Sequence, residues 1–117
     1  MNRAARSIQV FAFYLLLLGL VLVMSPNTLL ALFGIPATGE VWIRIVGMLA
    51  VLLGVYYWQA ARSGLRAFFV WTVPVRLSVP LFFGAFVLLG MAPPVLLAFA
   101  AVDAAAALWT WAALRRD

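Results

Sequence analysis

The chain has 117 residues, of which 68% are apolar and only 9% charged, so a soluble domain of this size could not hide its apolar surface from water. The net charge is +5, and all eight basic residues are arginines that flank or enter apolar segments instead of forming one patch, which indicates membrane topology and not a nucleic-acid-binding surface. The absence of Cys, His and Lys and the presence of only three acidic residues exclude thiolate sites, histidine-ligated haem and Schiff-base chemistry, so we expect no metal and no cofactor.

The first predicted membrane span covers residues 8–24, an unbroken apolar run after a short basic start. A cleaved signal peptide begins in the same way, but no A-x-A pattern precedes Pro26, which would lie at the start of the mature chain. We therefore expect an uncleaved helix. Ser25 and Pro26 are typical of the N-cap and first position of a new helix. Residues 27–33 are too few to span, so we expect a short interfacial helix there.

The second predicted span covers residues 41–59. Gly47, Ala50 and Gly54 recur at helical spacing and predict a smooth face that another helix can approach closely. The aromatic run around Tyr57 at the far end is typical of an aromatic belt at the membrane interface.

The third and fourth predicted spans cover residues 67–90 and 94–114, with Pro74 and Pro80 inside the third. Four crossings place the arginines of both chain ends and of the 60–66 connection on one side, which the positive-inside rule makes the cytoplasm. The sequence thus predicts an all-α integral membrane four-helix bundle formed by a single domain, residues 1–117. We expect a multi-pass protein of the inner (plasma) membrane with both termini cytoplasmic.

Two charges lie inside the last two spans. Arg76 follows Arg66 by ten residues and Asp103 precedes Arg115 by twelve, which places them about 15 and about 18 Å from the basic side, near mid-membrane. One interpretation is a structural ion pair that fixes which helices touch. The other is a polar site for a ligand head group, a proton or an ion.

Arg44 lies near the outer end of the second span, where it can snorkel outward as an interfacial anchor or meet Glu40 four residues earlier. Other polar side chains are secondary candidates, to be weighed against plain hydrogen bonds between helices. These secondary candidates are Tyr57, Thr72, Ser78 and Thr110.

The run WIRIVGMLAVLLGVYYWQAAR, with Arg44, Gly47, Gly54 and Tyr57, resembles the second helix of DoxX-like small four-helix membrane proteins. The order of the spans, the short outer segment and a late acidic residue are similar as well. The resemblance implies a four-helix bundle, and some members of that group are associated with membrane redox complexes. Because this chain lacks Cys and His, we expect no redox chemistry of its own.

The leading functional hypothesis is a non-enzymatic scaffold or accessory subunit, present as a homo-oligomer or in a larger membrane complex, with a lipid-like ligand between its helices. The alternative is a transporter or carrier of a small solute or lipid that uses Arg76 and Asp103. An enzyme acting on hydrophobic substrates would use Asp103 as acid or base and would need a polar pocket open to the lipid.

Overall fold

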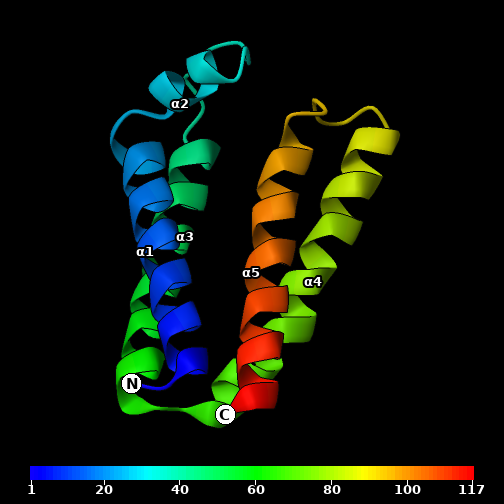
Figure 1. The fold of residues 1–117 in the computed structure, drawn as a ribbon. Coiled ribbons are helices and arrows are strands. Elements are labelled where there is room, and N and C mark those ends of the chain that lie inside the picture. Colours follow the sequence, from blue (N-terminus) through cyan, green and yellow to red (C-terminus); the bar gives the residue numbers. More distant parts are fainter. The chain divides into compact units, whose positions relative to one another are not determined.

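The computed structural model describes all 117 residues, and it contains five helices joined by loops and no strands (Figure 1). Four of its five helices are long enough and apolar enough to cross a membrane, which confirms the predicted all-α fold with four apolar helices and indicates a multi-pass membrane protein. The helices are α1 (Arg3–Met24), α2 (Pro26–Leu32), α3 (Trp42–Ser63), α4 (Arg66–Leu88) and α5 (Leu96–Arg116).

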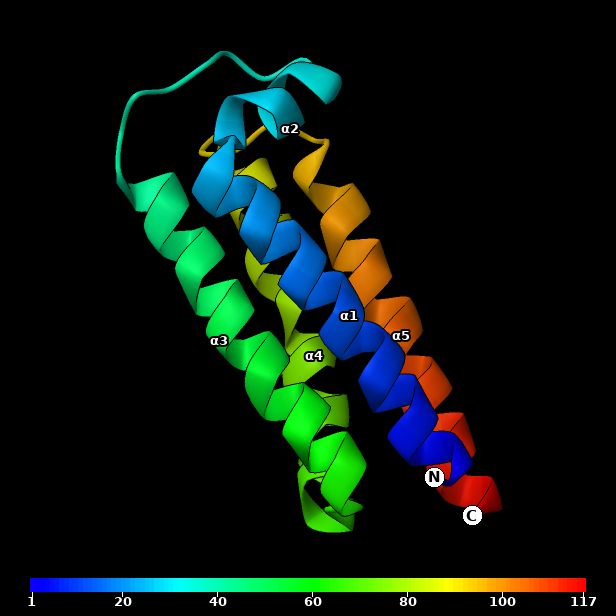
Figure 2. The ribbon, with the colours of Figure 1, turned by 90° about the vertical axis from the view of Figure 1, so that its left-hand side faces the viewer.

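The chain forms two compact units. One unit, Gln9–Gln59, contains most of α1 and α3, which lie side by side in both views (Figures 1 and 2), together with α2. We call it the α1–α3 unit. The other, Met1–Ile8 with Ala60–Asp117, contains the start of α1 and the packed helices α4 and α5. We call it the α4–α5 unit.

Glycines hold the helices of the α1–α3 unit close together. A Cβ atom added to Gly19 would lie 2.6 Å from the carbonyl oxygen of Gly47, and one added to Gly47 would lie 2.7 Å from the Cβ of Leu22. A Cβ on Gly54 would lie 2.8 Å from the Cγ of Leu16. The close helix approach predicted at Gly47 and Gly54 is therefore confirmed, with α1 as the neighbouring helix.

The short helix after the first span begins at the predicted position. Pro26 is its first residue and Ser25 its N-cap. The Ser25 hydroxyl, however, bonds to the Thr28 hydroxyl at 2.6 Å and makes no cap bond to a backbone amide. The Asn27 side chain fixes the following loop, since it accepts from the Thr38 amide at 2.9 Å and donates to the Thr38 carbonyl at 3.1 Å.

The arginine-bearing segments of the α4–α5 unit meet at one end. The Ala4 amide, in the first turn of α1, donates to Oδ2 of Asp117 at 2.9 Å, so a carboxylate from the carboxyl end satisfies a free amide at a helix start. Arg66, at the start of α4, donates to the Leu114 carbonyl at 3.4 Å. The amino end, the α3–α4 connection and the carboxyl end therefore lie together.

Candidate functional site

Arg76 is a buried charge in the α4–α5 unit. Only 2% of its surface is exposed, and its guanidinium bonds to hydroxyls on two helices. Nη2 donates to Oγ1 of Thr72 at 3.0 Å and to Oγ1 of Thr110 at 2.8 Å, while Nε donates to the Thr72 carbonyl at 3.3 Å. Two of the secondary candidates from the sequence, one on α4 and one on α5, are thus direct partners of this charge.

The hydrogen bonds continue beyond Thr110 to the start of α1. The Ser7 hydroxyl donates to the Ala4 carbonyl at 2.7 Å and lies 2.7 Å from Oγ1 of Thr110. A hydroxyl has one proton, so Thr110 donates to Ser7 and accepts from Arg76. We call Arg76, Thr72, Thr110 and Ser7 the hydroxyl chain.

Thr72 completes the hydroxyl chain on α4. Its proton goes to the Phe69 carbonyl at 2.7 Å, so its oxygen can accept from Arg76. Every hydroxyl in the chain is buried and satisfied as donor, and the three hydroxyls and one guanidinium together link α1, α4 and α5.

Asp103 lies half-buried on α5 and interacts electrostatically with Arg76. It precedes Thr110 by seven residues, about 10 Å along the helix. Helical side chains tilt toward the amino end of their own helix, and α4 and α5 run in opposite directions (Figure 1). The Arg76 side chain therefore leans toward the arginine-bearing end, where its guanidinium reaches the hydroxyls of Thr72 and Thr110.

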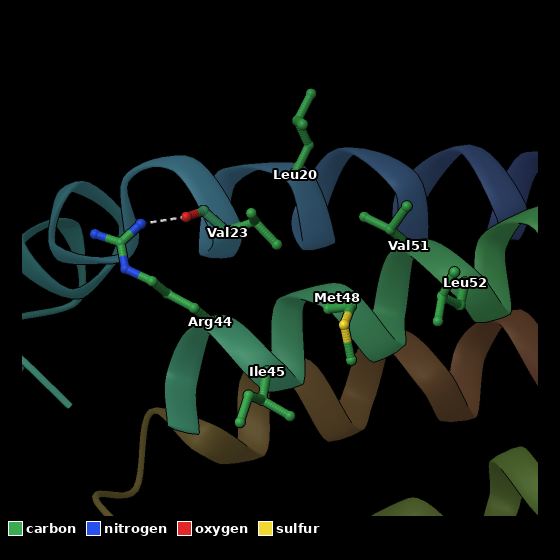
Figure 3. Close-up of a pocket in the computed structure, with 7 residues that line it drawn as sticks. All are labelled: Leu20, Val23, Arg44, Ile45, Met48, Val51 and Leu52. Carbon is green, nitrogen blue, oxygen red and sulfur yellow. Dashed lines mark hydrogen bonds between the residues drawn. The ribbon is translucent and has the colours of Figure 1, made fainter. Parts of the chain in front are cut away.

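Arg44 has a defined partner in the α1–α3 unit. Its guanidinium donates to the carbonyl of Val23 in the last turn of α1 (Figure 3). Carbonyls in a last helical turn lack partners within the helix and carry the negative end of its dipole, so a cation there is stabilising. Glu40 is exposed in the loop before α3, where its amide donates to Oγ1 of Thr38 at 3.2 Å.

The two remaining candidates, Tyr57 and Ser78, have partners of different kinds. Tyr57 is buried, with its ring 5.5 Å from the ring of Phe11 on α1, whereas the neighbouring Tyr56 is exposed, as a belt residue should be. Ser78 donates to the carbonyl of Val75 in its own helix at 2.5 Å.

Sequence reasoning missed Ser7, because it was assigned to the segment before the first span. The helix in fact begins at Arg3, and Ala4, Ser7, Ile8 and Phe11 form one buried face at helical spacing. This periodicity could have identified Ser7 from the sequence as a buried residue of the first helix.

A groove of about 460 Å³ lies between α1 and α3. Its volume falls in the range of small-molecule sites, and Arg44 contributes its only charged side chain. Figure 3 shows Arg44 at one end, reaching toward the last turn of α1. The lining residues are Leu20, Val23, Arg44, Ile45, Met48, Val51 and Leu52.

No family model matches the chain, and no curated protein or solved structure is significantly similar to it. The chain brings together no group of three or more His, Cys, Asp or Glu residues that could hold a metal ion. The functional argument therefore rests on the hydroxyl chain and the groove.

Proposed function

We propose that this protein is a non-enzymatic membrane scaffold or accessory subunit that binds a lipid-like molecule between its helices. The supporting observation is the hydroxyl chain. A buried arginine that bonds to hydroxyls of its own and a neighbouring helix fixes which helices touch, and releasing it for a substrate would break several bonds to a charged group. The likeness of α3 to DoxX-like proteins, some of them partners of membrane complexes, agrees with an accessory role.

The proposed topology has both termini in the cytoplasm and the chain in the plasma membrane. It is supported by the arginine-bearing segments that meet at one end through the Ala4–Asp117 and Arg66–Leu114 hydrogen bonds. The connections at residues 25–41 and 89–95 contain no arginine, as the positive-inside rule requires of segments on the opposite side.

The scaffold proposal predicts that the protein does not occur as a monomer. Exposed apolar side chains cover all four long helices, and small residues favour helix association in lipid. Cross-linking in native membranes should give species well above the 12.8 kDa monomer, either multiples of that mass or a complex with other subunits. A monomer alone, both in membranes and in mild detergent, would contradict the proposal.

A carrier that uses Asp103 and Arg76 is the second candidate, favoured by their electrostatic interaction and by the partial exposure of Asp103. Under the scaffold proposal, Asp103→Asn should change the free energy of unfolding by less than about 1 kcal/mol, since the hydroxyls still hold Arg76. Wild type and variant should also give the same proton flux in proteoliposomes loaded with a pH-sensitive dye. A flux present in the wild type and lost in a folded Asp103→Asn variant would establish the carrier instead.

A further inference from the structure

The groove between α1 and α3 combines an apolar row with one cation at its end. Arg44 and Leu52 are eight residues apart on α3, so the lined stretch extends about 12 Å along the helix. The other lining side chains are hydrocarbon or thioether, and no acidic residue lines the groove. An occupant would need an apolar body and a negatively charged head.

The groove is open to whatever surrounds the helices. About half of the surface of Leu20, Met48 and Leu52 is exposed, and these side chains belong to helices apolar enough to cross a membrane. In a bilayer the surrounding solvent is lipid, so an acyl chain can enter from the side without crossing water.

Arg44 can bind a lipid head group while it also donates to the Val23 carbonyl at the end of α1. A guanidinium has five N–H donors, and the bond to the Val23 carbonyl uses one nitrogen. The side chain is exposed and stands at the start of α3, where a lipid phosphate would lie. Arginine matches the geometry of a phosphate with two parallel bonds and meets it with a full opposite charge.

We infer that this groove binds an acidic phospholipid, with its phosphate at Arg44 and an acyl chain along Met48 and Leu52. This inference rests on the proposed function, because it names the lipid-like ligand and its site. The binding also places a head group at the end of the bilayer opposite the arginine-bearing segments. Lipid bound there would strengthen the contact between α1 and α3.

Native mass spectrometry of the delipidated full chain tests the inference. Phosphatidylglycerol and phosphatidylcholine with identical acyl chains are titrated separately. Both lipids offer Arg44 a phosphate, but the choline cation of phosphatidylcholine offsets that negative charge, so the wild type should bind phosphatidylglycerol about tenfold more tightly. Arg44→Gln should lose that preference and bind both lipids with similar, weaker affinity. Arg62→Gln, a matched control in the last turn of the same helix and outside the groove, should keep the preference.

A second variant tests whether lipid binds in the groove at all, independently of its head group. Met48→Trp fills the groove from a half-exposed position, and it should weaken the binding of both lipids about tenfold while circular dichroism shows unchanged helix content. If Arg44→Gln keeps the preference, or Arg62→Gln loses it equally, the acidic-lipid inference is wrong. If Met48→Trp leaves both lipids bound as before, the groove is not the site and the lipid-binding part of the proposed function fails too.

Discussion

Thr110→Val should destabilise the protein by about 1.5–3 kcal/mol, the range for hydrogen bonds to a charged group. The substitution keeps the side-chain shape but removes the oxygen that accepts from Arg76 at 2.8 Å and donates to Ser7. This loss should exceed the roughly 0.6 kcal/mol average for hydrogen bonds between membrane helices, because the guanidinium remains buried without that acceptor. Thermal unfolding in mild detergent, followed by circular dichroism, measures it.

A double-mutant cycle measures how much of this loss depends on the positive charge of Arg76. Arg76→Met removes the buried cation, so Thr110→Val should cost at least about 1 kcal/mol less in that background than in the wild type. Ser78→Ala is the control, since this hydroxyl bonds only within α4 and its loss should cost less than about 0.5 kcal/mol. Equal costs of Thr110→Val in the two backgrounds would show that Arg76 and Thr110 are not energetically coupled.

Hydropathy and glycine spacing predicted the elements well for a physical reason. A helix that crosses lipid must satisfy its backbone internally and be apolar over about 20 residues, so the four long helices follow from local sequence alone. Gly47 and Gly54 on one face of α3 predicted a close partner, and α1 provides it. Pro26 predicted the start of α2 in the same local way.

The hydrogen-bond partners of Arg76 could not be predicted by counting residues along the helices. Counting residues places the Cα atoms of Arg76 and Asp103 within one turn of each other, and their pairing stays a prediction, supported by their electrostatic interaction. The guanidinium also bonds to Thr72 and Thr110, which residue counting does not predict. Ser7 joins them because α1 begins at Arg3, and a hydropathy window does not detect a polar residue buried in the first turns.

The hydrogen-bond partner of Arg44, in the α1–α3 unit, likewise could not be predicted from the sequence. The place of Arg44 near the outer end of the second predicted span was readable from the sequence, but its partner depends on the register between α1 and α3. That register is set where Gly19 meets Gly47, and it brings the Val23 carbonyl to Arg44. A contact between two helices that are separate in the sequence requires the packed structure.

Alanine at Gly19 or at Gly47 should destabilise the protein by about 1–2 kcal/mol, even though alanine favours helix by about 1 kcal/mol. The added methyl on Gly19 would lie 2.6 Å from the Gly47 carbonyl oxygen and 2.7 Å from the Val51 nitrogen. These are backbone atoms and cannot rotate away, so α1 and α3 must separate along their contact. Unfolding midpoints in mild detergent, compared with the wild type, give the size of the loss.

Alanine substitutions at two further glycines should change stability in a different way from those at Gly19 and Gly47. A methyl on Gly54 would meet mainly the side chain of Leu16, which can change rotamer, so Gly54→Ala should be near neutral. Gly84, inside α4, has nothing within 4 Å of an added Cβ, and Gly84→Ala should stabilise by up to about 1 kcal/mol through helix propensity. Propensity alone would make all four substitutions stabilising. Only a backbone-to-backbone contact reverses the sign at Gly19 and Gly47 while leaving it unchanged at Gly84, so a gain at all four positions would show that α1 and α3 do not pack through these glycines.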